Sequence, residues 1–213
     1  MSTGLRRRAA WWLVLAACLG PLGMIAWWAA TGRLGANPVQ SMLDQLGVWG
    51  LRFLVIGLTL TPLRWATGWS WPMRFRRMTG LSAAACIALH LLVYLVAYQG
   101  LEWRAIGADL AKRPYIIIGM GAFLLLIPLA ATSTKGMIRR LGARRWQRLH
   151  RLVYVVAPAG VLHYALLVKA DETWPWSYAA AVACLLGIRA LRMVGRRVRP
   201  RGVPPGASIA HAG

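Results

Sequence analysis

Three histidines lie within, or at the edge of, long apolar segments of the chain: His90, His150 and His163. An ionisable side chain at membrane depth is costly, so it usually marks a functional site. Neutral imidazole is a common axial ligand of haem iron, and two such ligands give a site that carries electrons without binding oxygen. The alternative is that each imidazole only forms a hydrogen bond across a helix interface. Because three of the four histidines are placed this way, the sequence favours haem.

The segments that must position these histidines are long enough to cross a bilayer. Hydrophobic residues make up 58% of the 213-residue chain, and its mean hydropathy is +0.51. Each apolar run reaches roughly the 17–25 residues that a transmembrane helix needs. The six runs cover approximately residues 10–30, 46–63, 80–99, 114–131, 149–169 and 175–194. The sequence therefore predicts an all-α membrane protein, a bundle of six transmembrane helices with no room for a soluble catalytic domain.

The net charge of +21 is distributed as a topology signal. If the amino terminus is cytoplasmic, 20 of the 26 lysines and arginines fall on the inner side, and all five acids fall on the outer side. The positive-inside rule then places both termini of this multi-pass membrane protein in the cytoplasm. The basic loops are expected to contact lipid headgroups, and no nucleic-acid partner is expected. The predicted organisation is a basic terminus (1–9), a six-helix haem-binding domain (10–195) and a disordered tail (196–213).

His90 and His163 form the natural ligand pair. His90 lies about ten residues into the third run and His163 about 14 residues into the fifth, hence roughly 15 Å and 21 Å from the cytoplasmic side at 1.5 Å per residue. Helix tilt can absorb that difference. A single haem b between them, in the middle to outer half of the membrane, is therefore predicted.

His150 leaves more than one interpretation open. It lies 13 residues before His163, about 20 Å along a helix and on a different face of it, although Pro158 between them can kink or re-phase the helix. It is a candidate ligand of a second haem, for which the membrane holds no further histidine. It could also share the first haem site, or contact a flavin or quinone.

The cysteines carry no predicted chemistry. Cys18, Cys86 and Cys184 all lie in apolar runs, and none belongs to the Cys-x-x-Cys-His pattern of covalently attached haem. They are interpreted as small buried residues. The sequence also shows no convincing internal repeat.

Several short motifs together resemble a known family, the ferric-reductase-like transmembrane domain. Within it the chain is most similar to the haem-binding membrane subunits of periplasmic methionine-sulfoxide reductase systems. The resemblance spans about residues 10–195, and the motif around His150 is the most specific. The matching segments are residues 37–39, 61–64, 76–81, 112–116, 131–133, 141–142, 146–154 and 163–164. Gln40 departs from the family pattern, where a glutamate is expected.

The resemblance implies that His90, His150 and His163 are the haem ligands. It also implies a location in the bacterial inner membrane, haem b (one or two), FMN, electrons taken from the quinone pool, and a periplasmic molybdenum-containing methionine-sulfoxide reductase as partner. No Gly-rich nucleotide loop locates the FMN. The chain is accordingly interpreted as an electron-transfer subunit with no catalytic residues of its own, the catalytic site lying in the partner.

Two other functions remain as alternatives. A stand-alone membrane cytochrome could reduce ferric or other metal ions at the outer surface, as relatives of this fold do. A proton or solute transporter could use the histidines as a relay, but no acidic residue falls within the six runs and no pair of broken helices is evident. Haem absorbance of the purified protein separates the first two functions from the third.

The topology is testable with reporter fusions. Because the cations are concentrated on one side, fusions after Asn37, Gly107 and Asp171 are expected to report the outer compartment. Fusions after Arg74 and Gly142 should report the cytoplasm. An outer signal from either of the last two contradicts the predicted orientation.

Overall fold

The computed structural model describes residues 3–168 and 173–198, and in these residues it contains helices and no strand. Six helical stretches are long and apolar enough to cross a membrane, which confirms the predicted six-helix membrane bundle. They are Gly4–Ala30, Pro38–Thr67, Trp71–Tyr98, Pro114–Ala131, Ala143–Leu167 and Thr173–Gly195. Most of the predicted tail, residues 199–213, lies outside the described part of the chain.

Four spans are single helices: α1 (Thr3–Ala30), α2 (Pro38–Thr67), α5 (Pro114–Ala131) and α9 (Thr173–Val198). The third span is composite, with a 3-10 turn η1 (Trp71–Phe75), α3 (Arg76–Val93) and a π-helical turn η2 (Tyr94–Tyr98). The fifth span joins α7 (Ala143–His150) to α8 (Val153–Leu167). Two short helices lie between spans, α4 (Trp103–Lys112) and α6 (Lys135–Leu141).

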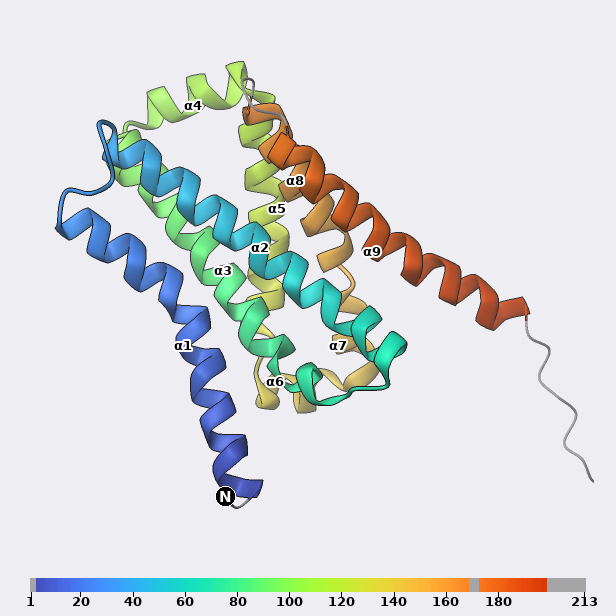
Figure 1. The fold of residues 1–213 in the computed structure, drawn as a ribbon. Coiled ribbons are helices and arrows are strands. Elements are labelled where there is room, and N and C mark those ends of the chain that lie inside the picture. The colour runs from blue at the N-terminus through green and yellow to red at the C-terminus, as the bar shows by residue number, and fades with distance from the viewer. Residues whose placement is uncertain (1–2, 169–172, 199–213) are drawn as a thin grey trace, which may run out of the picture.

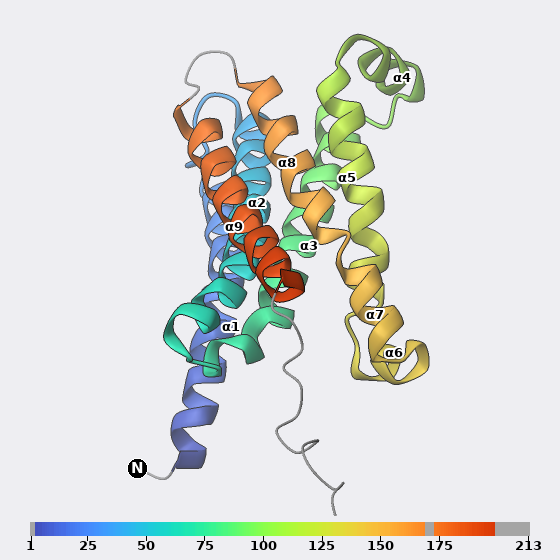
Figure 2. The same cartoon turned by 90° about the vertical axis from the view of Figure 1, so that its right-hand side faces the viewer.

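The bundle has two distinct ends. In Figure 1, α4 lies across one end, whereas η1, α6, α7 and the start of α1 lie at the other. Figure 2 shows the same division from the side, with α5 and α8 adjacent along their length. The sequence did not predict α4, because its ten residues are amphipathic and shorter than a span; only Ile106 among them is buried.

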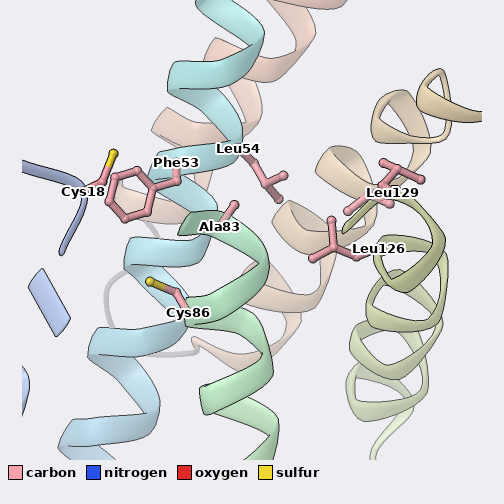
Figure 3. Packing of buried hydrophobic residues seen from close by; sticks show 8 residues of the cluster. Cys18, Phe53, Leu54, Ala83, Cys86, Leu126 and Leu129 are labelled. Atoms are coloured by element: carbon pink, nitrogen blue, oxygen red, sulfur yellow. The ribbon is translucent and has the colours of Figure 1, made fainter. Parts of the chain in front are cut away.

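Helix α2 is the most buried span and contributes to both apolar clusters. Phe53 and Leu54 join a cluster with residues of α1, α3, α5 and α8, which includes Cys18, Ala83, Cys86, Leu126, Leu129 and Val156 (Figure 3). Leu51 and Leu58 join a second cluster with α8 and α9. Many large apolar side chains elsewhere on the bundle are exposed, as expected where the solvent is lipid.

The ends of α2 follow from its sequence and extend it beyond its apolar run. The Asn37 side chain accepts a hydrogen bond from the Gln40 backbone N–H at 3.2 Å, and Pro38 begins the helix. Gly68, at φ 70°, ends it by donating to the Arg64 carbonyl. Because α2 begins at Pro38 and not near residue 46, Asp44 lies inside the second span. The expectation that no span contains an acid was therefore wrong.

One further expectation is corrected, and the fifth span has a break that the sequence did not predict. Helix α8 continues through Pro158 without a break, and the fifth span is instead interrupted at residues 151–152, between α7 and α8. Neighbouring helices allow a proline within a membrane helix. Cys18 and Cys86 are buried as predicted, but Cys184 is exposed on α9.

Helices α2 and α3 approach closely because Gly50 has no side chain. A Cβ atom at Gly50 would lie 2.6 Å from Cγ1 of Ile87, a distance that forces Ile87 to move. No atom lies within 4 Å of the equivalent position at Gly80, on the exposed face of α3. Alanine raises helix propensity at both positions. Alanine substitutions at the two glycines therefore differ only in the packing of the added Cβ atom.

We expect Gly50→Ala to lower the stability of the bundle by about 1–3 kcal/mol through overpacking. Gly80→Ala should leave the stability unchanged or raise it. Adding Ile87→Ala to Gly50→Ala should recover part of the loss, because it removes the atom that clashes. Thermal unfolding of the four proteins in one detergent is the measurement, and equal midpoints for Gly50→Ala and Gly80→Ala would refute the close contact.

Candidate functional site

His90 of α3 and His163 of α8 face each other inside the bundle. Their ring centroids are 6.2 Å apart and the ring planes are perpendicular, at 90°. Both side chains are half-buried. The structure therefore brings together the two histidines that the sequence pairs, although they come from helices far apart in the chain.

Each of these imidazoles is held by a backbone carbonyl of a neighbouring helix. His90 Nδ1 lies 2.9 Å from the Leu43 carbonyl oxygen on α2, and His163 Nδ1 lies 2.7 Å from the Tyr115 carbonyl oxygen on α5. A carbonyl oxygen can only accept a hydrogen bond, so each Nδ1 donates its proton. In its neutral form each ring therefore has its unshared electron pair on Nε2, and this is the form that ligates metals.

A glycine makes each of these hydrogen bonds possible. Gly47 lies four residues after Leu43, and Gly119 lies four residues after Tyr115. A Cβ atom would stand 3.3 Å from His90 Nδ1 at Gly47, and 2.7 Å from His163 Nδ1 at Gly119. The same arrangement of carbonyl, glycine and histidine therefore occurs twice, a structural repeat that the sequence analysis did not detect.

A cavity of about 190 Å³ adjoins both histidines and is lined by α2, α3, η2, α5 and α8. Its lining changes character along the bundle. The end beneath α4 is lined by polar side chains, among them Gln40, Asp44, Tyr94, Tyr98, Arg113 and Tyr115. The deeper end is apolar and includes Leu51, Leu54, Ile87, Phe123, Leu126 and Val156. The cavity is thus suited to a flat ligand with one polar and one apolar edge.

A hydrogen-bond network joins the polar end of the cavity to α4. Asp109 of α4 accepts from Gln99 at 2.6 Å and from the Tyr94 hydroxyl at 3.3 Å. Its other carboxylate oxygen lies 3.4 Å from Arg113 Nε. A hydrogen bond with Tyr98 raises the pKa of Arg113, as do Tyr115 and Asp109, so this guanidinium is permanently charged.

His150 lies elsewhere, at the end of α7, and does not line the cavity. Its Nε2 is 3.1 Å from Oγ1 of Thr132, and its ring stacks on Trp146 at 3.9 Å. The Thr132 hydroxyl itself donates to the Pro128 carbonyl at 2.6 Å, so His150 Nε2–H is the donor to Thr132. Its unshared electron pair is therefore on Nδ1, in contrast to the other two histidines.

Arg52 is a membrane-depth charge that the sequence analysis overlooked. It lies in the middle of α2, so one of the six cations assigned to the outer side is inside a span. Its Nε donates to the Tyr178 hydroxyl at 3.1 Å, and its guanidinium lies 4.7 Å from the centroid of the Trp49 ring. Its position within an apolar run was the signal available in the sequence.

The described residues contain no group of three or more His, Cys, Asp or Glu side chains that could hold a metal ion. The His90–His163 pair thus offers two protein ligands, too few for a tetrahedral structural zinc site. Two neighbouring imidazoles beside a cavity instead fit an iron atom whose remaining ligands come from a macrocycle.

Comparison with known proteins places the fold in one class. The family described as "Ferric reductase like transmembrane component" matches residues 46–161. This segment contains His90 and His150, and His163 follows two residues later. No solved structure matches the chain.

Curated relatives define the family more narrowly. A protein of Rhodospirillum rubrum is 51% identical over 86% of this chain and 88% of its own length. Relatives in Caulobacter vibrioides (46% identical; 90% of each chain) and Ralstonia nicotianae (45%; 94% and 91%) are similar. All three are named "Protein-methionine-sulfoxide reductase heme-binding subunit MsrQ". The chain belongs to the MsrQ family and is a multi-pass protein of the bacterial inner membrane.

Proposed function

We propose that this protein binds haem b between His90 and His163 and transfers electrons from the quinone pool to a periplasmic methionine-sulfoxide reductase. The observation that carries the proposal is that His90 and His163 have the same tautomer. Both Nδ1 atoms donate to backbone carbonyls, which leaves both Nε2 atoms able to ligate. The names of the relatives support the cofactor and the enzyme system.

The spacing of the two rings fits a shared iron atom. With metal–imidazole bonds of about 2.0–2.1 Å, as known for zinc, and each nitrogen about 1.2 Å from its ring centroid, opposed imidazoles have centroids roughly 6.4 Å apart. The observed separation is 6.2 Å. The polar and apolar ends of the cavity likewise match the two edges of a haem. The residues present therefore fit the group.

The protein's own residues would bind the haem, orient it and exclude water from it. Haem supplies one-electron chemistry when it is bound. His90 and His163 would hold the haem through their Nε2 atoms, and a haem held by two imidazoles carries electrons without binding oxygen. The leucines and phenylalanine of the deep end keep water from the site. The sulfoxide must then be reduced at a partner, and the outer end beneath α4 is the exposed end nearest the cavity.

His150 supports a second site more weakly. Its Nδ1 carries the unshared electron pair, and it lies towards the opposite end of the fifth span from His163. A second haem or another redox cofactor near the cytoplasmic side would use this nitrogen. We therefore expect His150 to affect at most part of the haem content.

The ligand pair is tested by absorbance of the purified protein. His90→Ala and His163→Ala should each abolish the low-spin b-type spectrum, because each removes one axial ligand. His150→Ala should keep most of that spectrum. Full haem content with unchanged spectra in both of the first two variants would exclude this pairing.

Because a histidine variant can also misfold, a pair of glycine variants provides an independent test. Gly119→Ala should lower haem retention, since its Cβ atom would be 2.7 Å from His163 Nδ1. Gly121→Ala, on the same helix, meets nothing within 4 Å and should retain haem. Equal retention in the two variants argues against the carbonyl-bound position of His163.

The partner is tested by reoxidation of haem in membranes. After chemical reduction, the haem should reoxidise promptly only when both the soluble molybdenum-containing reductase and a methionine sulfoxide are added. Each addition alone serves as the control. Rapid reoxidation by ferric chelates without the reductase would instead favour a stand-alone metal reductase, and a protein without haem would favour a transporter.

A further inference from the structure

Arg113 is the only lysine or arginine among the residues that line the cavity. It lies at the polar end, immediately before α5. It contacts the Tyr98 hydroxyl, and it makes two long contacts, 3.4 Å from Nε to Asp109 and 3.4 Å from Nη1 to the Tyr115 hydroxyl. A guanidinium has five N–H donors, so these contacts leave donors available to a ligand in the cavity.

The proposed ligand, haem b, has an anionic edge that needs a polar part of the cavity. Haem b carries two propionates on one edge of an otherwise apolar macrocycle, and an unpaired carboxylate is costly at membrane depth. Only the end of the cavity beneath α4 offers a cation together with hydroxyl donors. A guanidinium is also the side chain whose geometry best matches a carboxylate.

We propose that Arg113 binds a haem propionate, with the Tyr98 and Tyr115 hydroxyls as further donors, so that the propionate edge lies beneath α4. This inference rests on the proposed function. It assigns Arg113 to the cofactor site, and it orients the macrocycle within the bundle. The propionate edge then lies next to α4, the helix that a periplasmic partner would contact first.

Asp44 lines this end of the cavity and Asp109 contacts Arg113 there, and each acid already has other partners. Asp44 is exposed and accepts from the Gln40 side-chain amide at 2.8 Å. Asp109 accepts from Gln99 and Tyr94 as well as from Arg113. Asp109 therefore contacts Arg113 in addition to its own partners in the network. The competing explanation is that Arg113 serves only to fasten α4 to α5 through this ion pair.

The experiment compares two ligands that differ only in the propionates. The full-length protein, prepared without haem, is titrated with iron protoporphyrin IX and with its dimethyl ester. Wild-type protein should bind the diacid about tenfold or more tightly than the ester, as one charge-assisted hydrogen bond allows. Arg113→Gln should bind both ligands with affinities within about twofold, comparable to that of wild type for the ester.

The controls separate a propionate contact from a purely structural role. Lys112→Gln removes a neighbouring cation that does not line the cavity and should keep the full preference. Asp109→Asn breaks the ion pair while it retains the guanidinium, and it should also keep most of the preference. If Arg113 only fastens α4, Arg113→Gln keeps the preference too, and the inference is overturned.

The remaining outcomes are also decisive. Absence of any preference in the wild type overturns the inference, even if haem binds through His90 and His163. If the wild type gives a low-spin spectrum with neither ligand, that result instead contradicts the proposed function. Should Arg113→Gln bind neither ligand, the double variant Tyr98→Phe/Tyr115→Phe decides: a reduced preference supports the site and an unchanged one overturns it.

Discussion

The structure depends on a hydrogen bond from a histidine ring to a backbone carbonyl of the adjacent helix, and this bond occurs twice. Within a helix, the carbonyl of Leu43 or Tyr115 already accepts the N–H four residues later. A second donor approaches it most freely where that later residue is glycine, because a Cβ atom there would lie 2.7 Å from His163 Nδ1 or 3.3 Å from His90 Nδ1. Gly119 and Gly47 are the residues at these two positions. The bond sets the distance between the paired helices, the ring orientation and the tautomer together.

The requirement to satisfy polar groups in lipid explains how the rest of the cavity is arranged. Apolar packing gives little association energy in a bilayer, since lipid chains are as apolar as leucine. Polar contacts therefore decide which helices pair. Around the cavity they include the two histidine–carbonyl bonds and, near the surface, the network of Asp109, Gln99 and Tyr94. The π-helical turn η2 places Tyr94 and Tyr98 in one stack at this end, consistent with the frequent use of π turns at functional sites.

The number of spans and the His90–His163 pair were predictable from sequence, because both depend on simple rules. Run length counts the spans, and an ionisable residue at depth is rare enough to draw attention. The glycine partners were not predictable in this way. They are 43 residues before His90 and 44 before His163, in segments without matching sequence, so a search for repeats finds nothing. Helix α4 was missed because its apolar residues serve one face of a short surface helix. The break at residues 151–152 was not predictable because no proline or glycine lies there, whereas Pro158 is accommodated within α8.

Two arginines show how α9 joins this arrangement. Arg189 is buried, and its guanidinium donates to the carbonyls of Leu58 on α2 and Leu185 on α9. Arg52 projects in the reverse direction, from α2 to Tyr178 near the start of α9. The two helices are thus joined by a charged side chain from each partner at two different levels, with the cluster around Leu58 and Val182 between them. Since lipid competes weakly for such donors, these contacts fix α9 against the helix that also carries Gly47 and Leu43. The last span, α9, thereby helps to fix the position of the α2 backbone to which His90 is hydrogen-bonded.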